Sequence, residues 1–231
     1  MVTAPRPSRS SISTTSPTAS ERSISSARVS GSLPRSGDGG RKGRTATGLQ
    51  NTKAREIVHG DLSNYAGMEE ELSGFDACFF CLGLSSSGMQ EADYSRVTYD
   101  LTLAAAETLS GVNPGMTFIY VSGAGTDSSE KGRTMWARVK GRTENALLRL
   151  PLKAYMFRPG IIVPMDGIQS KTPAYRVFYK IAGPLLPMLR WALPNQVTST
   201  REMGRAMLAV ARGGYEKRIL EMKDIRVAAG Q

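Results

Sequence analysis

The sequence is short of the residues that build metal centres and disulfide frameworks. Its 231 residues include two cysteines, Cys78 and Cys81, and a single histidine. Both cysteines lie in one continuous apolar stretch, and residues three apart on a strand face opposite sides of a sheet. We therefore expect two buried, reduced thiols, no redox pair and no bound metal.

Long apolar runs are also missing. The best candidate for a membrane span, residues 177–193, is interrupted by Lys180, Pro184, Pro187 and Arg190, whereas a span needs about 20 consecutive, mostly apolar residues. The start of the chain has no apolar signal core. These absences predict a protein without a membrane span, and we expect it in the cytoplasm.

Aromatic residues are absent from the first 64 positions, and twelve of the first 40 residues are serine. Residues 1–43 carry seven Lys or Arg and two acids, so they supply +5 of the net charge of +10. Such a segment buries too little apolar surface to offset the entropy of ordering it. We expect residues 1–43 to form a disordered Ser/Arg-rich segment and residues 44–231 to form the domain. Because half of the excess charge lies in that segment, nucleic acid is an unlikely partner.

Beyond Arg55, apolar strands alternate with helical patterns. This alternation predicts an α/β fold, a Rossmann-like parallel sheet with helices on both faces. The expected strands are 56–59, 77–82, 116–121, 154–157 and 218–222, and the expected helices are 64–72, 92–109, 135–150 and 200–211. A proline-broken helical region is expected at 173–193. The helix at 200–211 has an N-cap signal in Ser199 or Thr200, with Glu202 in its first turn.

Several of the expected strands end in small or polar residues. These are Asp61, Gly83, Ser122 and Arg158, the last followed by Pro159 and Gly160. Ligands of open α/β sheets bind at the carboxyl ends of the strands, although glycine, serine and proline also occur in such loops for purely structural reasons. The four strand ends together predict a ligand site at this edge of the sheet.

From Arg44 to Arg226 the chain resembles the NAD(P)-binding, epimerase-like proteins of the atypical short-chain dehydrogenase/reductase superfamily. The segments that carry the resemblance are Phe79–Gly83, Tyr94–Leu101, Val121–Ala124, Val139–Gly141 with Glu144, Phe157–Gly160 and Arg205–Leu208. Each segment alone is weakly specific, but their joint order is specific at the level of the superfamily.

The resemblance implies NADP or NAD as cofactor and gives each strand end a role. Lys140 would hydrogen-bond the nicotinamide ribose, and Ser122 would stabilise a substrate oxygen. Arg44 falls where a guanidinium could hold the 2′-phosphate of NADP. The other implied cofactor contacts are Asp61 and Leu62 at the adenine, Cys81, Leu82 and Gly83 at the ribose and nicotinamide side, and Arg158, Pro159 and Gly160 beside the nicotinamide amide.

One catalytic residue of the superfamily is replaced. Trp136 stands four residues before Lys140, where the reactive tyrosine of the Tyr-x-x-x-Lys motif belongs. Residues four apart share a helix face, but an indole N–H only donates a hydrogen bond and does not ionise usefully. The usual proton relay through this position is therefore missing.

The superfamily's Gly-rich dinucleotide loop is missing as well. Gly31, Gly37, Gly39 and Gly40 lie among serine and arginine, without the preceding apolar strand and following helix that such a loop needs. We therefore expect a Rossmann domain that is incomplete at its N-terminus, with weak or absent cofactor binding as one outcome. One hypothesis for the change of character near Arg44 is an altered start or reading frame before it.

Two functions remain open from the sequence. The first is an oxidoreductase or epimerase-like protein that acts on a small-molecule substrate, with residues 171–195 as the lid. The second is a non-catalytic module of the same fold that senses NADP(H) or docks a protein partner, which Trp136 favours. A homodimer is compatible with either.

Overall fold

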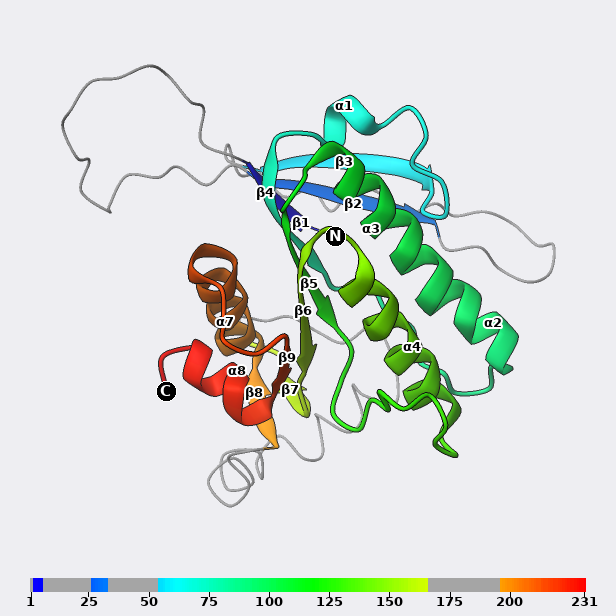
Figure 1. The fold of residues 1–231 in the computed structure, drawn as a ribbon, viewed down its shortest axis with the longest axis vertical. Coiled ribbons are helices and arrows are strands. Elements are labelled where there is room, and N and C mark those ends of the chain that lie inside the picture. Colours follow the sequence, from blue (N-terminus) through cyan, green and yellow to red (C-terminus); the bar gives the residue numbers. More distant parts are fainter. Residues whose placement is uncertain (1, 6–25, 33–53, 166–195) are drawn as a thin grey trace. The chain divides into compact units, whose positions relative to one another are not determined.

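The computed structural model of the chain describes residues 2–5, 26–32, 54–165 and 196–231 (Figure 1). The chain divides into two compact units. The first unit comprises Met1–Phe118 and Asp127–Ala154, and the second comprises Ile119–Thr126 and Tyr155–Gln231. The expected lid and Arg44 lie outside the described residues.

The first unit is built on a sheet of strand order β3-β2-β1-β4-β5. Its strands are β1 (Val2–Pro5), β2 (Ser26–Ser32), β3 (Ala54–Asp61), β4 (Phe75–Phe80) and the start of β5 (Thr117–Val121). β2 pairs parallel with β3, while β1 pairs antiparallel with both β2 and β4. β2, β3 and β4 therefore run in one direction, as the predicted Rossmann-like α/β fold requires, and β1 alone is reversed.

β1 and β2 lie within residues 1–43, where no strand was expected. β1 runs between β2 and β4 and pairs with both, so its short backbone is bonded on two sides. Strand formation depends on such pairing more than on intrinsic propensity. Composition therefore could not reveal these two strands.

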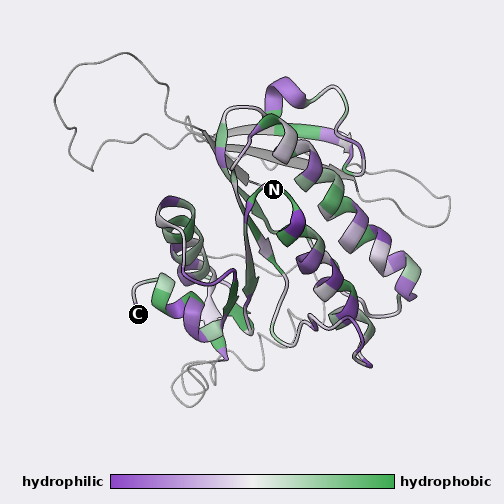
Figure 2. Cartoon of the chain, in the orientation of Figure 1, coloured by the Kyte–Doolittle hydropathy of each residue, from purple (hydrophilic) through white to green (hydrophobic). Residues whose placement is uncertain are grey.

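The helices of the first unit are α1 (Glu69–Leu72), α2 (Glu91–Ser95), α3 (Leu101–Val112) and α4 (Met135–Arg149). A π-helical turn, Arg96–Asp100, joins α2 to α3, so the helix expected at 92–109 is one long element with a π-turn in it. α1 is shorter than expected because the Asn64 side chain accepts a hydrogen bond from the Ala66 N–H (2.9 Å), and such local bonds compete with helix formation. Both hydrophobic and hydrophilic residues occur along α3 and α4 (Figure 2), as is usual for helices that pack one face on a core.

The core of the first unit lies between these helices and the sheet. Phe80 of β4 stacks on Phe118 of β5, with 5.8 Å between ring centroids, and Leu72 and Leu109 are fully buried. Buried Asn113 donates to the Leu72 carbonyl (2.8 Å) and accepts from the Phe75 N–H (3.0 Å). This one side chain fixes the end of α3 to the start of β4.

The second unit contains the end of β5, most of β6 (Lys153–Arg158), β7 (Ile161–Val163), β8 (Val197–Ser199), α7 (Thr200–Gly213), β9 (Ile219–Glu221) and α8 (Met222–Ala228). β6 pairs parallel with β9, and β7 pairs parallel with β8. The predicted N-cap of α7 is confirmed as a capping box between Ser199 and Glu202. β7, β8 and α8 were not foreseen, since each spans only three to seven residues.

No helix in the described ranges is both long and apolar enough to cross a membrane. Nor do the described residues contain a group of three or more His, Cys, Asp or Glu side chains that could hold a metal ion.

Candidate functional site

Asp61 occupies the last position of β3, with its carboxylate held in place locally. One carboxylate oxygen accepts hydrogen bonds from the N–H (2.9 Å) and the hydroxyl (2.6 Å) of Ser63. These bonds hold the pKa of Asp61 below its ordinary value of 3.8. The next residue, Leu62, turns its side chain into the core and is 5% exposed, so only its backbone is free to face a ligand.

The residues after β4 form the second strand end of the first unit. β3 and β4 run in the same direction, so Asp61 and the residues after Phe80 lie at one edge of the sheet. Cys81 and Gly83 are exposed and Leu82 is half-buried. An added Cβ on Gly83 would meet no atom within 4 Å, so the described part of the protein gives no packing reason for a glycine there.

The two cysteines differ in their exposure to solvent. Cys78 is fully buried, and burial raises the pKa of its thiol. Cys81 is exposed, contrary to the expectation of two buried thiols. It is the first residue after β4, which ends at Phe80. Both side chains are free thiols in this structure.

Helix α4 carries Trp136 and Lys140, and both side chains are half-buried. Their spacing of four residues places them on one face of the helix. Burial lowers the pKa of the Lys140 ammonium group, and the Glu144 carboxylate, one turn further on and fully buried, partly opposes that shift. An indole and a desolvated amine therefore share one face of α4.

The loop before α4 is anchored to the helix at two points. The Asp127 N–H donates to the Ala137 carbonyl (3.1 Å), and an added Cβ on Gly141 would lie 1.8 Å from the Asp127 carbonyl oxygen. The Asp127 carboxylate accepts from Ser129 and from the Gly132 N–H, which lowers its pKa. Asp127 is thus a loop-forming residue.

Ser122 follows β5 in the second unit and is 3% exposed. Its N–H and its hydroxyl both donate to the Phe157 carbonyl, at 2.9 and 3.2 Å. The hydroxyl expected to stabilise a substrate oxygen therefore bridges the ends of β5 and β6. Gly123, the neighbouring candidate position, has a φ of 127° and no hydroxyl.

The segment Arg158–Gly160 is likewise held by contacts within the second unit. Arg158 is 9% exposed and forms an ion pair with Glu221 of β9 (3.1 Å). The Pro159 carbonyl accepts from the Ala124 N–H (2.8 Å). A Cβ on Gly160 would lie 2.3 Å from the Gln196 carbonyl oxygen, so backbone crowding between the β7 and β8 segments accounts for this glycine.

The residues predicted from the sequence thus fall into two groups. The first unit holds Asp61, Leu62, Cys81, Leu82, Gly83, Trp136 and Lys140, and the second holds Ser122, Arg158, Pro159 and Gly160.

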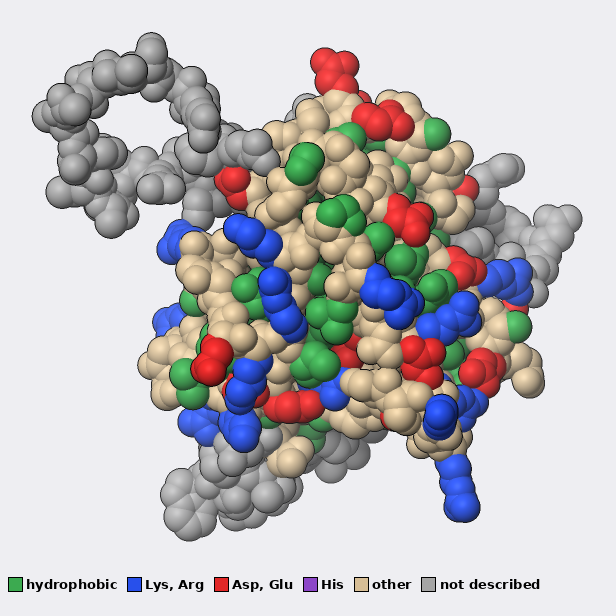
Figure 3. Space-filling view, in the orientation of Figure 1, with side chains coloured by type: hydrophobic (Ala, Val, Ile, Leu, Met, Phe, Trp, Pro, Cys, Tyr) green, Lys and Arg blue, Asp and Glu red, His purple; other side chains and the backbone are tan. Residues whose placement is uncertain are grey.

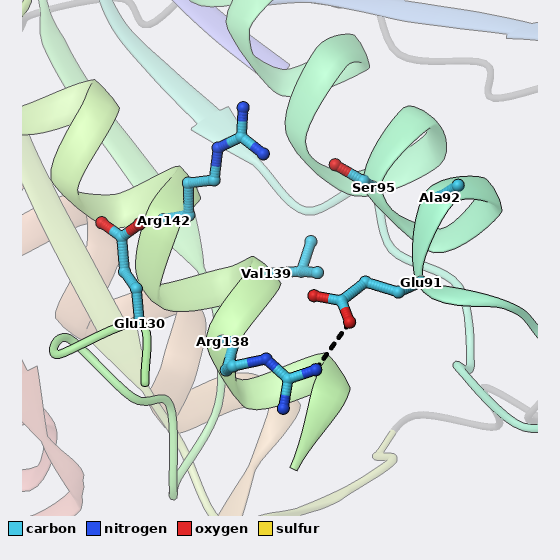
Figure 4. Close-up of a pocket in the computed structure, with 7 residues that line it drawn as sticks. All are labelled: Glu91, Ala92, Ser95, Glu130, Arg138, Val139 and Arg142. Atoms are coloured by element: carbon cyan, nitrogen blue, oxygen red, sulfur yellow. Dashed lines mark hydrogen bonds and ion pairs between the residues drawn. The ribbon is translucent and has the colours of Figure 1, made fainter. Parts of the chain in front are cut away.

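A hollow of about 470 Å³ on the first unit was not foreseen from the sequence. It lies between α2 and α4, and its polar lining comes from Glu91, Ser95, Glu130, Arg138 and Arg142 (Figure 4). Arg138 pairs with Glu91 (2.6 Å), and the Arg142 guanidinium lies 4.2 Å from the Tyr99 ring centroid. The spacing of Arg138 and Arg142 predicts that they share one helix face. Their partners, Glu91 and Tyr99, are more than 40 residues away in the sequence.

Comparison with known proteins gives a shared fold and one partial sequence relative. No family model matches the chain. Botcinic acid biosynthesis cluster B protein 16 of Botryotinia fuckeliana (strain B05.10) is 29% identical over 132 residues, which are 52% of this chain and 84% of that protein.

Solved structures that share the fold include two enzymes from microorganisms. UDP-N-acetylglucosamine 4-epimerase from Methanobrevibacter ruminantium M1, in complex with UDP-N-acetylmuramic acid, superposes with a TM-score of 0.54 at 16% identity over 72% of this chain and 61% of that one. The Bordetella bronchiseptica enzyme WbmG, in complex with NAD, gives 0.51 at 10% identity over 79% and 64%. This chain therefore spans less than two thirds of either enzyme. At these identities the likeness establishes the Rossmann-like fold of such enzymes.

Proposed function

We propose that this protein binds NAD or NADP along the strand ends of its first unit and does so without the proton relay of its enzymatic relatives. The observation that carries the proposal is the pairing of a half-buried Lys140 with Trp136 on one face of α4. The lysine is retained as a contact for the nicotinamide ribose, and the group that would exchange a proton with a substrate is replaced.

The residues of the first unit fit a dinucleotide in three respects. Gly83 is exposed and has open space around it, which lets a ligand approach the backbone. The Asp61 carboxylate is fixed by Ser63 at the same edge of the sheet, in position to accept from hydroxyl or amino groups of the adenosine part. Lys140 offers a donor whose desolvation strengthens a hydrogen bond to a ribose hydroxyl. When bound, the nicotinamide would supply hydride chemistry.

Two observations favour the non-catalytic role over an oxidoreductase or epimerase. Trp136 has no ionisable proton to deliver. The Ser122 hydroxyl is buried and donates its proton to the Phe157 carbonyl, so that proton is engaged within the protein. We propose that the protein senses the bound nucleotide or presents it to a protein partner.

An oxidoreductase or epimerase-like activity on a small substrate is the second candidate. The lowered pKa of Lys140 supports it, because a half-buried amine with a depressed pKa can exchange a proton nearer to neutral pH than an ordinary lysine.

Nucleotide binding and turnover, measured on the same preparation, separate these outcomes. We expect saturable quenching of NADPH or NADH fluorescence, with no oxidation of the nucleotide across a panel of small aldehydes and ketones. Gly83→Leu, which fills the open space, should abolish binding, whereas Gly111→Leu, at an exposed helical glycine with equally open surroundings, should retain it. Turnover by the wild type would establish the second candidate, and a folded protein that binds neither nucleotide would contradict both.

A further inference from the structure

Within helices α7 and α8 of the second unit, the exposed charged side chains are all basic. Each helix contains one acid, Glu202 in α7 and Asp224 in α8, and both are buried at 6% exposure, where they form the capping boxes. The exposed charged residues of the two helices are all basic: Arg201, Arg205, Arg212 and Lys223. Figure 3 shows Lys and Arg side chains over these helices, with acidic side chains of neighbouring segments beside them.

The cations of α7 follow a straight line along the helix. Arg201, Arg205, Leu208 and Arg212 are spaced by four, three and four residues, which places them in one stripe on an α-helix. At about 1.5 Å per residue the stripe is roughly 16 Å long. A row of cations of this length suits an extended anionic surface better than a single small anion.

Two exposed aliphatic side chains accompany the basic ones. Leu208 in the middle of the stripe is 38% exposed, and Val227 of α8 is 62% exposed. No aromatic residue occurs in α7 or α8, so stacking against nucleobases is not available. Aliphatic side chains surrounded by cations are typical of helices that lie on anionic lipid, where the apolar groups enter the headgroup boundary.

The nearest acids of the second unit do not cancel this charge. Glu221 is engaged by Arg158, and Asp224 by Lys217 (2.8 Å). Glu216 is exposed in the loop before β9. Residues 200–231 contain seven Lys or Arg and four Asp or Glu, and two of those four acids are the buried Glu202 and Asp224.

We propose that the α7–α8 face docks the protein on membranes that contain anionic phospholipid. Arg205, Arg212 and Lys223 contact the headgroups, and Leu208 and Val227 enter the boundary with the acyl chains. The protein is held peripherally, by charge first and by shallow apolar contact second.

Co-sedimentation with vesicles tests the proposal. We expect the full chain to pellet with vesicles of phosphatidylcholine mixed with phosphatidylserine and to stay in solution with phosphatidylcholine alone. Each cation near an anionic surface contributes about fivefold to binding, so neutralising two lowers the affinity about 30-fold. Arg205→Gln with Arg212→Gln should show that loss, and raised salt should reproduce it.

Matched variants keep the test specific. Lys131→Gln with Arg133→Gln removes the same charge from exposed positions of the first unit and should leave binding unchanged. Leu208→Asn keeps every charge and should weaken binding through the lost apolar contact. Circular dichroism verifies that each variant is folded. Equal binding to both vesicle types, binding unaffected by the α7 substitutions, or capture of duplex DNA in place of vesicles would overturn the proposal.

Discussion

At the scale of single residues, Trp136 and Lys140 are the positions at which the two proposed functions, nucleotide binding alone and catalysis, make different demands. Both are half-buried on one face of α4, and the desolvated Lys140 amine has a lowered pKa. A tyrosine at position 136 would bring an ionisable phenol onto the same face. With tryptophan at position 136, this face of α4 holds an amine but no ionisable phenol.

Replacing Trp136 by tyrosine tests the effect of the missing phenol. Trp136→Tyr should catalyse NADPH-dependent reduction of a small carbonyl compound at about 100 times the background rate measured with the wild type, because a positioned general acid contributes 10² or more. Trp136→Phe, which is aromatic but has no donor, is the control and should stay at the wild-type level. An equal rate in all three proteins would show that position 136 does not limit turnover.

Gly141 owes its identity to a backbone contact. A Cβ there would lie 1.8 Å from the Asp127 carbonyl oxygen, so Gly141→Ala must push the loop off α4. We expect a loss of about 3 kcal/mol in the free energy of unfolding, in the range of overpacking substitutions, measured by urea denaturation. Gly111→Ala, at a helical glycine with open surroundings, should be neutral or stabilising by up to about 1 kcal/mol. Equal stability of the two variants would contradict the packing account.

At the scale of elements, the two helix caps form a natural comparison. The Ser199 hydroxyl accepts from the Glu202 N–H (3.2 Å) at the start of α7, whereas Thr134, the N-cap of α4, makes no side-chain capping bond. Ser199→Ala should therefore lower the free energy of unfolding by about 1 kcal/mol. Thr134→Ala should change it far less in the same denaturation experiment, and a cost as large as that of Ser199→Ala would refute the difference.

Glu202 makes the α7 cap sensitive to acid. Burial alone would raise its pKa, but hydrogen bonds from Gln231, Ser199 and Thr198 together hold it below the ordinary value of 4.5. The unfolded state therefore takes up this proton first as the pH falls, so the stability from the Glu202 carboxylate is present above pH about 4.5 and is lost below it. The stability gap between wild type and Glu202→Gln should narrow in denaturation curves as the pH falls below about 4.5. A gap that stays constant would show that the charge does not contribute.

The elements also show what a sequence can reveal about this fold. β3, β4, β5, β6, β9, α4 and α7 were predictable because each has a periodic apolar pattern or a cap of its own. β1 and β2 were not, since their pairing partners are the only reason for their extended form.

The sequence predicts which residues follow the strands, but it does not predict the contacts that these residues make. Gly83 and Lys140 were identified from motif order alone. The bonds that occupy Ser122 and Arg158 join residues 35 and 63 positions apart, and no local pattern reports such contacts.

At the scale of the whole molecule, the two proposals rest on different properties: the first on the fold and the second on the distribution of charge. The proposed dinucleotide site belongs to the strand ends of the first unit, and the proposed docking surface belongs to α7 and α8 of the second unit. The net charge of +10 is shared equally between residues 1–43 and the rest of the chain. Residues 44–231 are thus only mildly basic. The proposed docking depends on the local group of cations on α7 and α8 and not on the net charge.

Titration of the wild-type chain with NADPH and NADH, followed by nucleotide fluorescence, tests the central claim most directly. The account predicts saturable binding of at least one nucleotide, abolished by Gly83→Leu and retained in Gly111→Leu. Absence of saturable binding by a protein that circular dichroism shows to be folded, or binding that Gly83→Leu leaves intact, would contradict it.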